Sequence, residues 1–168
     1  MIVKTGLVYT PIRELGERLR SGRTSPVELT EAFLERLEDL GPKYNSVVTV
    51  TRDRADSQAR RAEREMESGS YRGPLHGIPY GAKDLLATSG GIPTSWGAAP
   101  MRGQTFEHDA TVIERLEEAG SILTAKLAMI ELAGGAGYRQ PHASFTGPPR
   151  NPWNPETWTG GSSSGEDR

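Results

Sequence analysis

A helical segment that runs into a strand through a single glycine constrains the fold of this chain most. Residues 109–119 (DATVIERLEEA) predict a capped helix, Gly120 ends it, and residues 121–126 (SILTAK) predict a strand directly afterwards. The side chains expected to face inward from this helix are Val112, Ile113 and Leu116. A helix that feeds a strand so closely is typical of an α/β layer. We therefore expect an α/β fold.

Helices dominate the first half of the sequence. A proline at the first helical position predicts a helix from residue 11 to Gly22. The capping box Ser25-Pro26-Val27-Glu28 predicts a second helix, which should end at Gly41-Pro42. A third helix, 52–68, carries only a thin apolar stripe and is expected to be peripheral. The candidate strands are 46–51, 78–83 and 121–125, which are few for such a layer.

Composition and charge exclude several classes of function. The 168 residues include 20 Lys+Arg and 22 Asp+Glu, so a basic face for nucleic acid is not expected. Cysteine is absent, which excludes disulfide scaffolds, zinc ribbons and thiol nucleophiles. The histidines are spaced too widely for a metal motif, and no metal site is expected: His76, His108 and His142. Neither a membrane span nor a signal peptide is recognisable, so a cytoplasmic location is expected.

A long loop rich in glycine and proline, residues 134–165, ends in Thr159-Gly160-Gly161-Ser162-Ser163-Ser164-Gly165. Such a segment can be a flexible linker, a phosphate cradle or the location of a catalytic serine. Glu166-Asp167 stand where a phosphate-binding loop needs Lys-Ser/Thr, so the cradle is excluded. A nucleophile elbow at Ser163 is also rejected, because residues 151–155 (NPWNP) do not suit a strand and no histidine follows.

Lys83 is the candidate base. It lies in an apolar segment that contains glycine, residues 77–86 (GIPYGAKDLL). A lysine accepts a proton only as the neutral amine, which burial favours. Asp84 would oppose this if it faced Lys83, but successive side chains of a strand point to opposite faces. The alternative interpretation is a surface lysine at the end of a strand.

Four motifs resemble the amidase signature family in their order and spacing. They are the G-x-P-x-x-x-K-D segment at 77–84, the DATV-type stretch at 109–129, the NPW loop at 151–155 and the glycine–serine loop at 159–165. The resemblance runs from about Leu75 to Gly165 and continues more weakly through the N-terminal helices. It implies the family's α/β/α sandwich around a mixed sheet, of which this chain holds the N-terminal portion.

The resemblance also implies a Ser–cis-Ser–Lys triad that hydrolyses carboxamides. It identifies Lys83 as the base and Ser162 as the bridging serine on a cis peptide, which relays a proton between Lys83 and the nucleophile. Ser163 would be a neighbouring hydrogen-bond partner. The nucleophile would form an acyl-enzyme, which water releases as the acid. The resemblance implies a small-molecule amide as substrate, and neither a cofactor nor a metal.

The family's nucleophile belongs to a second glycine–serine motif further along the chain, and this sequence ends at Arg168 before any such motif. We therefore expect one incomplete amidase domain over residues 1–168. It would consist of a mostly helical part, 1–70, and a part with the signature motifs, 71–168. The hypothesis is an N-terminal fragment, through truncation or a frame error after Gly165, that lacks the nucleophile.

Three functions are consistent with these motifs. The first is an amidase that hydrolyses a carboxamide to an acid and ammonia. The second is the glutamine-hydrolysing subunit of a tRNA-dependent amidotransferase, which would involve both a nucleic acid and a partner protein. Leu132-Ala133-Gly134-Gly135 stands where that subunit would have an F-A-M-G-like sequence, which favours a stand-alone amidase. The third is a catalytically dead fragment that acts as an interaction module. No oligomeric state is predicted.

Overall fold

The structure, a computed structural model that describes residues 6–134 and 144–165, contains a three-stranded mixed sheet. The order is β1-β3-β2, and the strands are β1 (Val47–Val50), β2 (Pro79–Lys83) and β3 (Ile122–Leu127). β1 pairs with β3 antiparallel. β2 and β3 are parallel, because the N–H of Ile122 bonds the carbonyl of Ile78 at one end and the N–H of Asp84 bonds that of Leu127 at the other. The three strands expected from the sequence are confirmed.

The chain divides into two compact units, which are described separately. The first contains residues 6–36, 51–80 and 114–124 of the described chain, and the second contains residues 37–50, 81–113, 125–134 and 144–165. Four elements contribute residues to both units: the helices α3 (Pro26–Tyr44) and α5 (Thr111–Glu118) and the strands β2 and β3.

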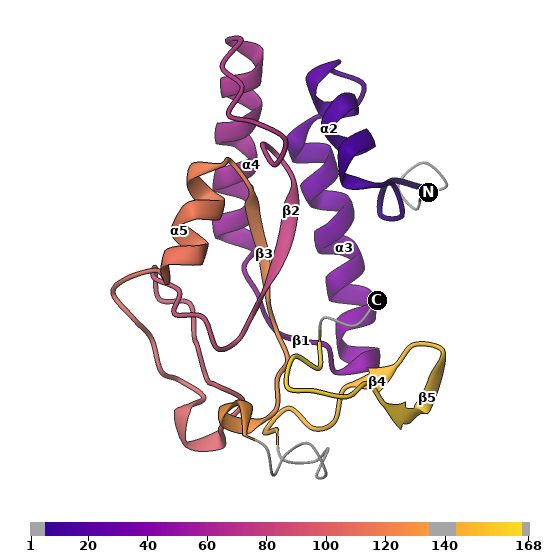
Figure 1. Ribbon diagram of the computed structural model, residues 1–168, viewed down its shortest axis with the longest axis vertical. Helices are drawn as coiled ribbons and strands as arrows, with labels where there is room; N and C mark the ends of the chain where they lie inside the picture. Colours follow the sequence, from indigo (N-terminus) through magenta and orange to yellow (C-terminus); the bar gives the residue numbers. More distant parts are fainter. Residues whose placement is uncertain (1–5, 135–143, 166–168) are drawn as a thin grey trace. The chain divides into compact units, whose positions relative to one another are not determined.

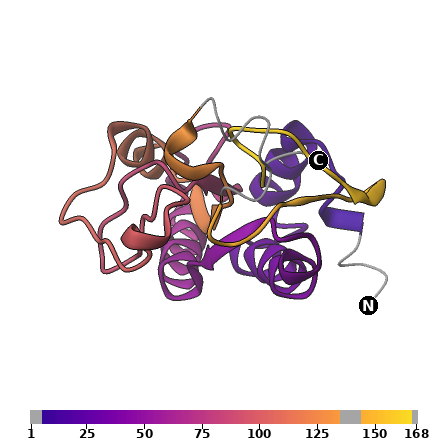
Figure 2. The same ribbon diagram turned by 90° about the horizontal axis from the view of Figure 1, so that it is seen from below.

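Helices α2 (Ile12–Arg20), α3 (Pro26–Tyr44) and α4 (Arg52–Glu67) supply most of the first unit. α3 and α4 lie side by side, as Figures 1 and 2 both show. The apolar core of the unit consists of Leu7, Leu15, Leu19, Leu29 and Ile78, with Phe33 and Met66 packed against it. The buried residues of α4 are Ala55, Gln58, Ala59 and Ala62, which confirms its thin apolar stripe.

Helix α3 begins as predicted but ends later. Its capping box is formed, since the N–H of Glu28 donates to Ser25 Oγ at 3.1 Å and the N–H of Ser25 donates to Glu28 Oε2 at 3.0 Å. The predicted end at Gly41-Pro42 is wrong, because the helix continues to Tyr44 with Pro42 inside it. A proline so near the end removes only one N–H from the last turn. The glycine before it is used for packing, since a Cβ at Gly41 would lie 2.8 Å from Val47 Cγ2.

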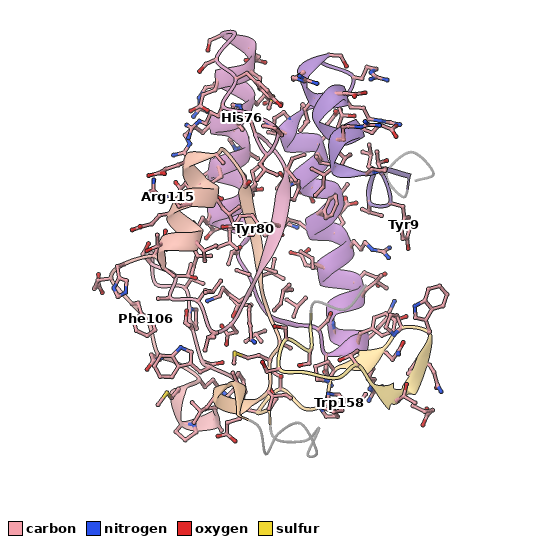
Figure 3. The ribbon with its side chains drawn as sticks, in the orientation of Figure 1. Tyr9, His76, Tyr80, Phe106, Arg115 and Trp158 are labelled. Atoms are coloured by element: carbon pink, nitrogen blue, oxygen red, sulfur yellow. The ribbon has the colours of Figure 1, made fainter. Side chains whose placement is uncertain are left out.

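Helix α5 (Thr111–Glu118) precedes β3 as the sequence predicts, but its inward face is narrower. Ile113 is fully buried and Leu116 is half-buried, whereas Val112 is 46% exposed. The expectation that Val112 faces inward is therefore wrong, since its neighbour Ile113 fills the buried position of this two-turn helix and adjacent side chains diverge by about 100°. Arg115 points outward from α5 (Figure 3).

The end of the described chain forms a hairpin in the second unit. β4 (Arg150–Asn151) and β5 (Asn154–Trp158) pair antiparallel and enclose Pro152 and Trp153 in their turn. The expectation that residues 151–155 do not suit a strand is wrong, because Pro155 lies within β5. A two-stranded ribbon leaves outer N–H positions unpaired, and proline is tolerated there. Among the described residues, no helix is long and apolar enough to cross a membrane.

His76 is the buried histidine of the first unit and lies beside the C-terminal half of α4 (Figure 3). Its Nδ1 accepts the N–H of Arg72 at 3.2 Å, and its Nε2 lies 3.0 Å from Glu65 Oε2. Burial lowers the pKa of His76, against the carboxylate of Glu65, which raises it. The ring also packs against the turn before β3, since a Cβ at Gly120 would lie 3.0 Å from His76 Cγ. Burial in the folded state thus disfavours the protonated form of His76.

We expect acid to weaken the fold through His76. Its folded pKa lies below the ordinary value of 6.5, so the unfolded state binds more protons, and the free energy of unfolding should fall as the pH drops through 6.5. Urea unfolding of His76→Gln should show a flatter pH dependence in this window. His108→Gln is the matched control, because it replaces an exposed histidine that is not in contact with Glu65. Equal slopes in the parent and in His76→Gln would contradict the assignment.

Candidate active site

Lys83 and Ser162 meet in the second unit. Lys83 is the last residue of β2, and its Nζ donates a hydrogen bond to Ser162 Oγ at 2.8 Å. Both side chains are half-buried, and 79 positions separate them in the sequence. The Gly161–Ser162 peptide bond is cis, as the resemblance implies. The structure thus brings together the two residues that the sequence analysis named as base and bridging serine.

The chain that follows β3 supports both residues through its backbone. The N–H of Asp84, next to Lys83, donates to the carbonyl of Leu127 at 3.0 Å. The N–H of Ile130 donates to the carbonyl of Ser162 at 3.0 Å. Because the two anchor points are three residues apart on one extended segment, the end of β2 and the glycine–serine loop share one backbone support.

Two glycines allow the glycine–serine loop to lie close to the segment that follows β3. The N–H of Gly165 donates to the carbonyl of Ala128 at 2.9 Å. A Cβ at Gly165 would lie 2.6 Å from the backbone N of Ala128 and would collide with the carbonyl oxygen of Ser46. A Cβ at Gly161 would collide with the side chain of Ile130. The sequence analysis recognised these glycines as part of a motif, and the structure shows the contacts that require them.

The two serines after Ser162 have different surroundings. Ser163 is half-buried, and its side chain has no hydrogen bond to another residue of the described ranges. Its role as a supporting hydrogen-bond partner stays a prediction. Ser164 is buried, and its carbonyl accepts the hydroxyl of Thr159 at 2.8 Å. Its own Oγ is without a partner among the described residues.

Asp84 and Lys83 have separate partners. Asp84 is fully buried and accepts hydrogen bonds from the N–H of Ser95 at 3.0 Å and from the Ser95 hydroxyl. Within residues 6–134 and 144–165, no carboxylate forms an ion pair with Lys83. This agrees with the alternation of side chains expected at the end of a strand. The half-buried amine of Lys83 thus faces a serine hydroxyl.

The buried polar residues around Asp84 were not among the site residues expected from the sequence. Lys126 lies in β3 with its side chain fully buried, and its Nζ is 3.5 Å from Asp84 Oδ1. Thr94 and Ser95 are also buried. The available signal was a lysine inside the apolar strand SILTAK, where a solvent-exposed charge is not expected.

Neither of the two described histidines, His76 and His108, contributes to this geometry. His108 is exposed and packs edge-on against Phe106, with ring centroids 5.7 Å apart. His142 lies outside the described residues, as does Gly135. Within the described part of the chain, no group of three His, Cys, Asp or Glu side chains could hold a metal ion.

Comparisons with known proteins identify the family to which this chain belongs. The chain matches the Amidase family over residues 28–167 and belongs to it. It is 41% identical over 154 residues to a glutamyl-tRNA(Gln) amidotransferase subunit of Methylococcus capsulatus, covering 92% of this chain and 31% of the relative. It is 39% identical, with the same two coverages, to a protein of Mycobacterium tuberculosis that carries the name amidase AmiD.

The fold is shared with solved structures of this family. The native peptide amidase of Stenotrophomonas maltophilia superimposes with a TM-score of 0.83 at 32% identity, over 94% of this chain and 33% of that one. The N-terminal portion of an amidase-signature fold, as expected from the motifs, is therefore confirmed. The chain spans about a third of the length of the relatives that it matches.

Proposed function

We propose that this chain carries the proton-relay half of an amidase that hydrolyses a carboxamide to a carboxylic acid and ammonia. The observation that carries the proposal is the 2.8 Å hydrogen bond between Lys83 Nζ and Ser162 Oγ. Membership of the Amidase family supports the reaction class. In this proposal Lys83 is the base, Ser162 is the relay, and Ser163 is a supporting hydrogen-bond partner of the same loop.

The proposed reaction moves one proton along two hydroxyls. Neutral Lys83 accepts the proton of the Ser162 hydroxyl, and Ser162 Oγ in turn accepts the proton of the nucleophilic serine. The nucleophile's oxygen bonds to the amide carbon, and collapse of the tetrahedral intermediate breaks the C–N bond. The proton returns along the same path to the leaving nitrogen, which departs as ammonia. Water then attacks the acyl-enzyme by the same relay and releases the acid.

The nucleophile of this scheme is not among the 168 residues. We expect a purified polypeptide of these residues to release ammonia no faster than a Lys83→Ala control, because loss of a nucleophile leaves only binding and electrostatic effects. The measurement is ammonia release from a panel of amides that includes glutamine. Serine-dependent turnover by this polypeptide would contradict the proposal that the nucleophilic serine is not among these 168 residues.

The coding DNA provides a direct check of the fragment hypothesis. Reading beyond codon 168 in all three frames should reveal a second glycine–serine motif followed by further strands. The gene product that contains this motif is the protein in which the activity should be measured. If no frame contains the motif, the fragment hypothesis is wrong.

The second candidate is the glutamine-hydrolysing subunit of an amidotransferase. The 41% identity to the Methylococcus capsulatus protein favours it, whereas Leu132-Ala133-Gly134 in place of an F-A-M-like sequence favours a stand-alone amidase. Ammonia release that is restricted to glutamine among the amides and is stimulated by a partner protein would support the amidotransferase. Release from other amides without a partner would support the amidase. If the gene product that contains the nucleophile releases no ammonia under either condition, the interaction module without catalysis is the remaining candidate.

A further inference from the structure

A buried ion pair lies next to the proposed base. Lys126 and Asp84 are both fully buried, and 3.5 Å separates Lys126 Nζ from Asp84 Oδ1. The ammonium of Lys126 also donates to the carbonyl of Leu86 at 2.8 Å and to Thr94 Oγ1 at 2.7 Å. All these residues belong to the second unit. The proposed proton relay uses none of them.

A contribution to stability does not by itself explain why Lys126 and Asp84 form a buried ion pair. Burying two charges carries a desolvation cost that their attraction offsets only partly, and apolar replacements are often as stable. The position of the pair is more informative. Asp84 follows Lys83 directly, so their Cα atoms are about 3.8 Å apart, and this carboxylate is the nearest one in the sequence to the proposed base.

The side chains of Asp84 and Lys83 are directed to different partners. Asp84 directs its carboxylate to Lys126 and to Ser95, whose N–H donates to Oδ2 at 3.0 Å. Lys83 directs its amine to Ser162. The carboxylate of Asp84 thus pairs with the buried Lys126, and Lys83 is left to bond Ser162.

We propose that Lys126 is a positioning residue for Lys83. It neutralises Asp84, so no uncompensated negative charge lies beside the amine of Lys83, which keeps its hydrogen bond to Ser162. The catalytic meaning of this role rests on the proposed function, whereas the charge pairing itself does not. Without Lys126, an uncompensated buried carboxylate would remain beside Lys83 and would favour its protonated, unreactive form.

Competitive acetylation of the 168-residue chain tests the pairing without any amide substrate. A trace of acetic anhydride labels neutral amines, and mass spectrometry compares Lys83 with the exposed Lys43 as internal reference. We expect Lys126→Met to lower the Lys83-to-Lys43 labelling ratio roughly fivefold near pH 9, about the effect of one partly screened charge. Lys126→Gln, which keeps an N–H donor for Leu86, should give the same result and replaces Lys126→Met if that variant does not fold.

The double variant Lys126→Met/Asp84→Asn separates charge from structure. Removal of the carboxylate should restore the parent ratio, although the hydrogen bonds of Lys126 to Leu86 and Thr94 stay lost. Ile113→Ala creates a cavity in the same unit without changing any charge, and it should not lower the Lys83-to-Lys43 labelling ratio. An unchanged or raised ratio in Lys126→Met, or no recovery in the double variant, overturns the proposal. Amide hydrolysis plays no part in this assay. A negative labelling result therefore leaves the proposed amidase function standing, and a negative hydrolysis result leaves the proposed charge pairing standing.

Discussion

Replacing Lys83 with alanine should lower the rate of amide hydrolysis at least about a thousandfold in the gene product that also contains the nucleophile. The variant removes the nitrogen that lies 2.8 Å from Ser162 Oγ, so the proton of the attacking serine has no acceptor at the end of the relay. Ser162→Ala should have a loss of similar size, because it interrupts the same path. The measurement is kcat/KM from ammonia release.

Lys43→Ala is the matched control for this experiment. Lys43 is an exposed lysine of α3 that pairs with Asp39, and exposed pairs of this kind contribute little. Its removal should leave the rate and the fold unchanged. Circular dichroism should show that Lys83→Ala and Ser162→Ala are folded. A folded Lys83→Ala variant with the parent rate would remove Lys83 from the mechanism.

Gly165→Ala should cost about 3 kcal/mol of stability in the 168-residue chain. The added methyl would lie 2.6 Å from the backbone N of Ala128 and would collide with the carbonyl of Ser46, and neither backbone atom can rotate away. Relief requires the loop to move and breaks the bond from the N–H of Gly165 to the carbonyl of Ala128. Thermal or urea unfolding measures the loss.

Gly103→Ala provides the comparison for Gly165→Ala. A Cβ at Gly103 would meet no atom within 4 Å, and its substitution should change stability by less than about 0.5 kcal/mol. Equal stabilities for the two variants would mean that the glycine–serine loop does not pack against the segment after β3.

Local chemistry was sufficient to predict most helices and strands. The capping box at Ser25 and the one-glycine turn at Gly120 each act over a few residues, and both are present in the structure. The errors occurred where a neighbouring segment packs against or pairs with the residues concerned, which single-residue preferences do not include. α3 continues through Pro42 while Val47 packs against Gly41, and Pro155 lies in a strand because β5 is part of a two-stranded ribbon.

The candidate site was less accessible to local reasoning. Residue chemistry alone left Lys83 as either a base or a surface lysine, and the resemblance to a family paired it with Ser162. Spacing could not predict their contact, because 79 positions separate them and the segment after β3 supports both. The ion pair of Asp84 with Lys126 was missed for the same reason, since it joins the residue after β2 to the C-terminal end of β3.

The central claim is that Lys83 and Ser162 act as one relay, and a double-variant cycle tests it most directly. The kcat/KM for ammonia release should be measured for Lys83→Ala, Ser162→Ala and the double variant of the gene product that contains the nucleophile. Residues that act as a unit are strongly non-additive, so the double variant should be about as slow as the slower single variant. Losses that multiply would show two independent contributions and contradict the relay.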